Sequence, residues 1–113
     1  MKNLGPYEIN NIYAGECSEM MKALPDGCID LTVTSPPYDN LREYKGYVFD
    51  YKPVIEQLYR ITKPGGVVVW VVADATINGS ETGTSFKQAL YGESVGFNLH
   101  DTMIYRKNSY PFP

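Results

Sequence analysis

The chain has 113 residues, which is enough for one domain with one modest hydrophobic core. Its 43% hydrophobic and 20% charged residues exclude a disordered or fibrous protein. No apolar run is long enough to span a bilayer and the start lacks a signal-peptide core, so we expect a cytoplasmic protein. The net charge of -3 argues against a stand-alone nucleic-acid binder, which is normally basic.

Cysteine and histidine give no sign of a metal site. Cys17 and Cys28 lack neighbouring cysteine or histidine pairs at ligand spacing, so we interpret both as reduced structural residues. His100 is the only histidine, and no motif builds a catalytic triad or a multi-histidine site around it.

The first third of the chain alternates strand and helix signals. Residues Tyr7–Gly15 favour a strand, and the apolar spacing within Cys17–Leu24 predicts a short helix. Pro25–Gly27 then forms a turn. Alternating apolar residues in Ile29–Val33 predict a second strand, which the two prolines in Ser35–Pro37 end, because proline cannot donate a ladder hydrogen bond.

A polar loop from Tyr38 to about Asp50 separates that strand from the next helix. The apolar residues of Tyr51–Tyr59 recur at helical spacing and predict an amphipathic helix. After the break at Lys63–Gly66, the continuous apolar run Val67–Ala73 predicts a central strand covered on both faces.

The last third predicts a loop at Asn78–Ser85, a short helix at Phe86–Tyr91 and a final strand at Phe97–Tyr105. Strands and helices that alternate in this way indicate an α/β fold with a mostly parallel sheet and flanking helices. Ligands of such sheets bind beyond the carboxyl ends of the strands. That rule points to Gly15–Cys17, to Thr34–Tyr38 and to Ala73–Asp74.

The sequence Thr34-Ser35-Pro36-Pro37-Tyr38 can bind an exocyclic amine of a planar ring. Such an amine is a poor nucleophile, because its lone pair is delocalised into the ring. If Ser35 Oγ and the Pro36 carbonyl accept its two N–H bonds, the nitrogen turns toward tetrahedral geometry and its lone pair becomes available. Tyr38 would stack on the ring face. The alternative is a strand that merely ends in a Pro-Pro turn.

These residues resemble the signature of the amino-group DNA methyltransferases, which methylate cytosine N4 or adenine N6 with S-adenosylmethionine. Their signature is Asp/Asn/Ser-Pro-Pro-Tyr/Phe after a buried strand. Further segments resemble the family in the same order along the chain: Ile12–Cys17, Leu24–Leu31, Arg60–Val67, and Ile104–Asn108 followed by Pro111.

The resemblance implies a partial Rossmann-like methyltransferase fold, S-adenosylmethionine as cofactor and double-stranded DNA as substrate. It also implies roles for individual residues. The implied catalytic residues are Ser35, Pro36, Pro37 and Tyr38; the implied cofactor contacts are Glu16, Cys17 and Thr34; and Lys107, in a segment that resembles the family, is an implied DNA contact. Arg42, in the loop after the signature, could also contact DNA phosphates, and a solvated surface charge is the alternative. Asp74 could face the same site, but a solvated carboxylate at a strand end is the alternative.

Two features depart from the family pattern. Glu16 stands where aspartate is usual, and the chain has no Phe-x-Gly-x-Gly turn, which in this family holds the methionine end of the cofactor. In one subclass of the family, called the β order, the signature comes before that turn along the chain. Residues 1–113 therefore resemble a single domain that is the N-terminal, signature-bearing part of a β-order enzyme, and we expect it to be inactive alone.

The missing part also has a consequence for the sheet. In the family, two strands that are absent here separate the first strand from the signature strand. We therefore expect exposed strand edges, which lead to self-association or to a new pairing within the chain.

Two other functions remain open. Glutamine-amide methyltransferases of proteins carry a similar Asn-Pro-Pro-Tyr signature, and the chain could also be a non-catalytic α/β binding or assembly module. Within the DNA enzymes, Ser-Pro-Pro-Tyr is commoner among those acting on cytosine, so we favour N4-cytosine over N6-adenine. A restriction endonuclease is a possible partner of such an enzyme in the cell.

Overall fold

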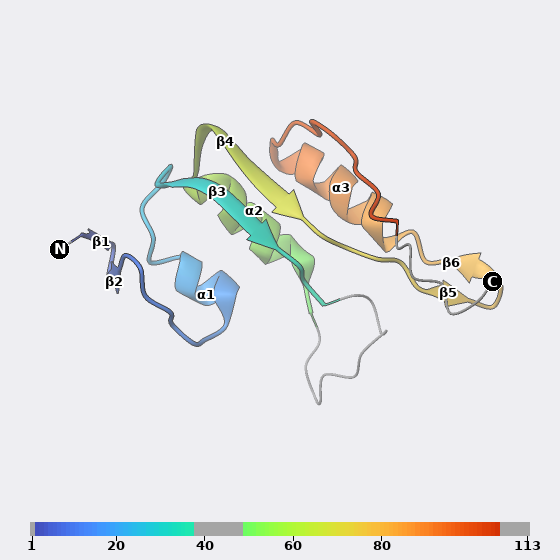
Figure 1. Cartoon of the computed structure of the whole chain (residues 1–113), viewed down its shortest axis with the longest axis horizontal. Helices are drawn as coiled ribbons and strands as arrows, with labels where there is room; N and C mark the ends of the chain where they lie inside the picture. Colours follow the sequence, from blue (N-terminus) through green and yellow to red (C-terminus); the bar gives the residue numbers. More distant parts are fainter. Residues whose placement is uncertain (1, 38–48, 107–113) are drawn as a thin grey trace.

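The computed structural model describes residues 2–37 and 49–106. Its elements are arranged along an elongated body (Figure 1). In chain order they are β1 (Asn3–Leu4), β2 (Tyr7–Glu8), α1 (Cys17–Met21), β3 (Ile29–Thr34), α2 (Tyr51–Ile61), β4 (Thr62–Trp70), β5 (Thr76–Ile77), β6 (Ser80–Glu81) and α3 (Thr84–Val95).

The centre of the fold is the parallel pair of strands β3 and β4, which α2 connects. Leu31 lies opposite Val67 and Thr34 lies opposite Trp70, with an irregularity in the pairing between Ile29 and Leu31. Strand β3 and helix α2 confirm the sequence predictions. A strand also forms at Val67, but β4 begins at Thr62 and ends at Trp70, so it includes the predicted break Lys63–Gly66 and stops short of Ala73. Among the described residues this is the only parallel pair, because the other two strand pairs are antiparallel hairpins. The mostly parallel sheet is therefore confirmed only at this pair.

Helix α2 supplies most of the hydrophobic core. It begins where the Asp50 side chain accepts a hydrogen bond from the Lys52 amide at 3.1 Å, which satisfies one of the unpaired amides of the first turn. One face of the helix is buried, through Val54, Leu58 and Ile61. Residues of α1 and of both central strands pack against that face, as the amphipathic spacing predicts.

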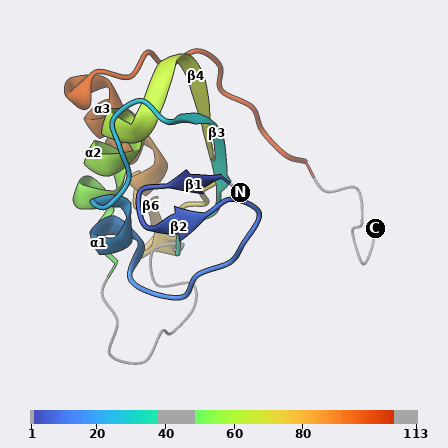
Figure 2. The same cartoon turned by 90° about the vertical axis from the view of Figure 1, so that its left-hand side faces the viewer.

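The three helices lie on the same side of the β3–β4 pair (Figure 2). The prediction that strand Val67–Ala73 is covered on both faces is therefore wrong for this structure. Val67 is 53% exposed and Val71 is 44% exposed. The reason is that no helix of the described residues lies over the other face of the pair.

The predicted strand Tyr7–Gly15 is also wrong beyond its first two residues. Tyr7–Glu8 pairs with Asn3–Leu4 in an antiparallel hairpin, with Gly5 in the turn at φ 57°. Asn10, at φ 66°, then turns the chain out of the extended conformation. A strand needs a neighbour to satisfy its backbone groups, and here the nearest available partner is local. This is the new pairing within the chain that we expected as one outcome.

The region predicted as a loop at Asn78–Ser85 instead contains most of a hairpin and the start of a helix. Strands β5 and β6 pair around Asn78 and Gly79, which both have positive φ, at 53° and 78°. An Asn-Gly dipeptide favours this tight hairpin turn. Helix α3 is also longer than the predicted Phe86–Tyr91, because it begins at Thr84 and ends at Val95.

The predicted final strand Phe97–Tyr105 does not form. Phe97 packs its ring edge against Tyr59 of α2, with ring centroids 5.2 Å apart. From there to residue 106 the chain has no regular structure, and Met103 and Ile104 are exposed. Strand propensity alone does not make a strand where no partner strand lies alongside.

Contacts with α2 fix the position of α3. The Tyr91 hydroxyl donates a hydrogen bond to the Glu56 carboxylate, which raises the pKa of Tyr91 to about 12. Tyr51 meets the same ring edge-on at 5.8 Å.

In the described residues no helix is both long and apolar enough to cross a membrane.

Arg60 of α2 holds the first helix and the following turn against the core. Its guanidinium donates to the Met21 carbonyl at 2.7 Å, to the Leu24 carbonyl at 2.8 Å and to the Asp26 carboxylate at 2.7 Å. These two carbonyls lie at the end of α1 and just after it, where helices leave carbonyls unpaired. The Met21 carbonyl also accepts from the Leu24 amide at 2.9 Å, so Arg60 adds a second, charged donor there and supplies a charged donor to the Leu24 carbonyl.

We predict that Arg60→Ala destabilises the chain by roughly 2–3 kcal/mol, because it leaves two carbonyls without their charged donor. The exposed Asp26 carboxylate contributes little to this loss. Urea unfolding followed by circular dichroism measures the effect. Arg60→Lys is the control: it keeps the charge but cannot reach both carbonyls with a planar fork, so it should lose an intermediate amount. A loss below about 0.5 kcal/mol in Arg60→Ala would contradict this assignment.

Candidate functional site

The signature residues lie where β3 ends. The Thr34 carbonyl, the last of the strand, accepts a hydrogen bond from the Val71 amide at 2.9 Å, which ties the start of the signature to β4. Ser35 is exposed, Pro36 is buried and Pro37 is half-buried. The described residues donate no hydrogen bond to the Pro36 carbonyl. The buried Pro36 thus anchors the segment, and the exposed Ser35 lies directly before it.

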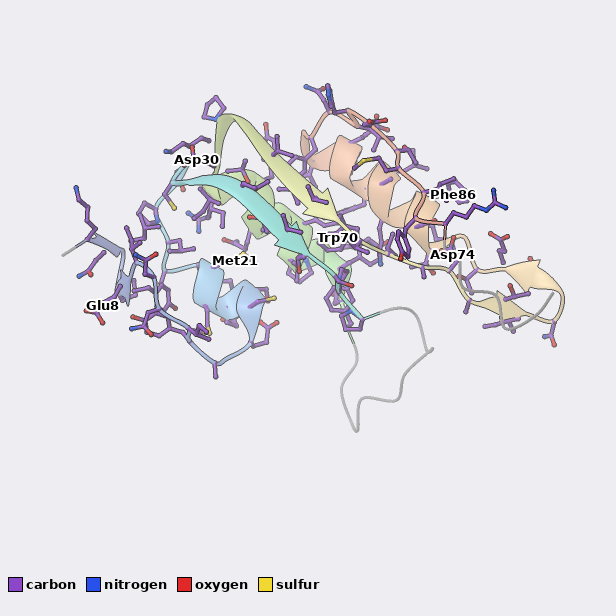
Figure 3. The ribbon with its side chains drawn as sticks, in the orientation of Figure 1. Glu8, Met21, Asp30, Trp70, Asp74 and Phe86 are labelled. Carbon is purple, nitrogen blue, oxygen red and sulfur yellow. The ribbon has the colours of Figure 1, made fainter. Side chains whose placement is uncertain are left out.

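Because β3 and β4 are parallel and in register at Thr34 and Trp70, their carboxyl ends meet at one edge of the pair. Figure 3 shows the two ends of this pair: Asp30 lies at the amino end, and Asp74 lies beyond the carboxyl end. The signature therefore lies at the carboxyl ends of the parallel strands, which is where open α/β sheets bind ligands.

Asp74 lies beyond this edge, but its carboxylate is engaged by α3. It accepts from the Ser85 amide and from the Ser85 hydroxyl, both at 2.7 Å. Gly83 precedes the helix and has no side chain to cap it, so Asp74 caps the helix from a distance. The Asp74 carboxylate is thus not simply solvated, which was one of the two alternatives that the sequence left open, because it caps α3.

Sequence reasoning also missed a polar pair beneath α3. The Trp70 indole N–H donates to the Gln88 side-chain oxygen at 2.8 Å, and Gln88 is only 4% exposed. Trp70 lies opposite Thr34, so this bond links the carboxyl end of the strand pair to α3. A single glutamine inside a predicted helix carries no signal of such a contact, because its partner is 18 residues away.

Glu16 and Cys17, the expected cofactor contacts, lie at the start of α1. One Glu16 carboxylate oxygen accepts from the Ser18 hydroxyl at 2.5 Å and from the Glu19 amide at 2.9 Å. The hydrogen bond from Ser18 is the main cause that lowers the pKa of Glu16. This oxygen caps the helix, and the second carboxylate oxygen has no hydrogen bond within the described residues.

An open apolar hollow of about 260 Å³ lies beside this helix. Two tyrosine rings, a glycine and sulfur-bearing side chains line it, and its lining residues are Tyr7, Tyr13, Gly15, Cys17, Met20, Met21 and Leu24. Desolvation, followed by the neighbouring Glu16 carboxylate, raises the pKa of the Cys17 thiol. Cys17 is therefore a neutral lining residue at neutral pH and has no activated thiolate.

The described site residues lie at the end of β3 and at the start of α1. Thr34 adjoins Ser35, Pro36 and Pro37 at the end of β3. Helix α1 runs with its first turn toward the same end of the strand pair (Figure 1). Tyr38, Arg42 and Lys107 lie outside the described residues.

Comparison with known proteins identifies the family. The model of the DNA methylase family matches residues 29–113. The orphan methyltransferase M.BamHII of Bacillus amyloliquefaciens is 63% identical over 94 residues, which cover 83% of this chain and 36% of that protein. The type II methyltransferase M.BglII of Bacillus subtilis is 38% identical over 71 residues, or 57% of this chain and 19% of the relative.

A third relative is the type II beta methyltransferase M.BslI of Bacillus sp. strain NEB-606. It is 30% identical over 125 aligned positions, which cover 88% of this chain and 14% of the relative. The chain thus spans about a third or less of the length of these relatives. No solved structure matches the chain. The family match extends over most of the chain and includes the signature at the end of β3, so this chain belongs to the DNA methylase family.

Proposed function

We propose that this chain provides the amine-binding part of an enzyme that transfers a methyl group from S-adenosylmethionine to the exocyclic amine of a flipped DNA base. We favour cytosine N4 over adenine N6, because the signature begins with Ser35. The names of M.BamHII, M.BglII and M.BslI all describe methyltransferases, and that of M.BslI describes a beta methyltransferase, which supports the proposal.

The observation that carries this proposal is the position of the signature at the carboxyl edge of the parallel pair. The bond from the Val71 amide to the Thr34 carbonyl and the buried Pro36 ring would hold Ser35 Oγ and the Pro36 carbonyl in fixed positions. Two fixed acceptors can hold both N–H groups of an amine and direct its lone pair away from the ring plane. Fixed geometry of this kind accounts for a large share of the rate in direct transfer.

The residues present fit only part of S-adenosylmethionine, which supplies an electrophilic methyl group when bound. The second Glu16 carboxylate oxygen could accept from ribose hydroxyls, and Tyr7 and Tyr13 in the apolar hollow could hold the flat adenine ring. Thr34 would lie between this region and the signature. The sequence contains no Phe-x-Gly-x-Gly turn for the methionine end.

The wider setting is also part of the proposal. We infer a partial Rossmann-like fold in which residues 1–113 form one domain, the signature-bearing part of the enzyme. Double-stranded DNA is the substrate, with Arg42 and Lys107 as phosphate contacts. A restriction endonuclease acts as a cellular partner. In the described residues β3 pairs with β4 alone, and its free edge would let copies of the chain self-associate.

The experiment uses a hybrid enzyme, in which this chain replaces the segment of M.BamHII that it matches. We expect Ser35→Ala in the hybrid enzyme to slow methylation of mixed-sequence DNA by about ten- to hundredfold, because an unpaired amine hydrogen costs roughly 1–3 kcal/mol. Ser80→Ala, at an exposed serine of the β5–β6 hairpin, is the matched control and should leave the rate unchanged. Equal rates for both variants would refute the role of Ser35.

A further inference from the structure

Helix α3 holds the chain that leaves β4 at two points. The Trp70 indole N–H donates to the Gln88 side-chain oxygen at 2.8 Å. Three residues earlier in the helix, the amide and the hydroxyl of Ser85 donate to the Asp74 carboxylate, both at 2.7 Å. Figure 3 shows Trp70 and Asp74 along this part of the chain, beside α3. The residues between them are therefore fixed at both ends by the same helix.

The bond between Trp70 and Gln88 has little freedom to move. Gln88 is 4% exposed and is, with Ser18, one of two buried polar side chains among the described residues. A polar group that is buried needs its hydrogen-bond partner, because water is not there to replace it. The Trp70 ring also packs against the core residues of α2. Gln88 therefore holds a ring that is already confined by packing.

This bond lies next to the link between β4 and the signature. Trp70 is opposite Thr34 in the parallel pair, and the Val71 amide donates to the Thr34 carbonyl at 2.9 Å. That amide belongs to the planar peptide group that Trp70 begins, so it moves with the Trp70 backbone. Ser35 follows Thr34 directly. A displacement of Trp70 is thus passed to the backbone that carries Ser35.

We propose that Gln88 is a positioning residue for the signature. It fixes Trp70, which places the Val71 amide, and that amide fixes the backbone from which Ser35 presents its hydroxyl. Gln88 itself would contact neither the base nor the cofactor. The effect on methyl transfer rests on the proposed function, whereas the positioning of the backbone does not. Small displacements of a reacting group are costly, so α3 would influence the rate from outside the site.

Amide hydrogen exchange, measured by NMR in the 113-residue chain, tests the positioning step without any reaction. Gln88→Met keeps a side chain of similar size but offers no oxygen to the indole. We expect the ratio of the Val71 to the Leu58 exchange rate to rise at least tenfold, since Leu58 lies in the core and reports global unfolding. Trp70 is the only tryptophan, so its indole N–H resonance reports the lost bond directly.

Tyr91→Phe is the matched control. It removes the hydrogen bond from α3 to Glu56 of α2 and leaves Gln88 in place, so the exchange ratio should stay within twofold. Gln88→Glu keeps an oxygen acceptor at the same reach and should restore most of the protection of the Val71 amide. Should Gln88→Met fail to fold, Trp70→Phe removes the same bond from the donor side and should raise the ratio likewise.

The hybrid enzyme tests the consequence for catalysis. Gln88→Met should slow single-turnover methyl transfer about tenfold and change the affinity for S-adenosylmethionine less than twofold, because it displaces the amine acceptors and not the adenosine contacts. In a Trp70→Phe background the same substitution should have little further effect, since the bond is already absent.

The positioning role is overturned if the exchange ratio is the same in Gln88→Met and Tyr91→Phe, or if both variants slow methyl transfer equally. Gln88 then only stabilises the fold. A hybrid enzyme that transfers no methyl group even without these substitutions would contradict the proposed function instead, and the exchange ratio would still decide the role of Gln88.

Discussion

Tyr38→Ala in the hybrid enzyme is expected to slow DNA methylation by about ten- to hundredfold. The reason is the loss of a stacking surface for the flipped base, a contact worth about 1–3 kcal/mol. Tyr38 directly follows Pro37 in the signature sequence. Folding should change little, because the core residues Val54, Leu58 and Ile61 all come from α2. Radiolabelled methyl transfer measures the rate, and thermal unfolding measures stability.

Tyr38→Phe is the control for this prediction. It keeps the aromatic face and removes only the hydroxyl, so it should retain most of the methylation rate. If Tyr38→Ala lowers stability and activity to the same extent, the residue has a packing role and the stacking role is wrong.

The 113-residue chain alone is expected to transfer no methyl group to DNA above background. Direct transfer requires the methyl carbon and the amine to be held within about 3–3.5 Å of each other and in line. In the proposed arrangement the signature would hold the amine, and Glu16 with the neighbouring hollow would contact the adenosine end of the cofactor. The sequence has no glycine-rich turn for the methionine end, so the methyl group is not positioned.

Calorimetric titration with S-adenosylmethionine and a methyl-transfer assay on mixed-sequence DNA test this prediction together. We expect cofactor binding weaker than millimolar and no product. Micromolar binding with turnover that Ser35→Ala abolishes would show that the chain is sufficient by itself. The net charge of -3 also predicts weak affinity for DNA, since phosphate contacts require clustered positive charge.

The parts of the fold that the sequence predicted correctly are those whose partners lie within the chain. Strands β3 and β4 form backbone hydrogen bonds with each other, and the apolar face of α2 packs against the inner face of this pair. The predicted strands at Tyr7–Gly15 and Phe97–Tyr105 have comparable side chains but no adjacent strand, so one became a local hairpin and the other irregular chain. Strand formation depends on a partner that the local sequence does not encode.

The candidate site shows the same division. The position of Ser35–Pro37 at a strand end follows from the prolines, which stop a ladder wherever it forms. The capping of α3 by Asp74 joins residues eleven positions apart through tertiary folding, and the spacing gave no sign of it. The β5–β6 hairpin, in contrast, was predictable from Asn78-Gly79, a turn signal that we had assigned to a loop.

We propose that this chain supports methylation of an exocyclic amine of DNA. Nucleoside mass spectrometry of DNA treated with the hybrid enzyme and S-adenosylmethionine tests it most directly. We expect N4-methylcytosine, and its loss in the Ser35→Ala and Tyr38→Ala variants. N6-methyladenine would correct the choice of base and keep the chemistry. A folded hybrid enzyme that yields 5-methylcytosine, or no methylated base at all, would contradict the account.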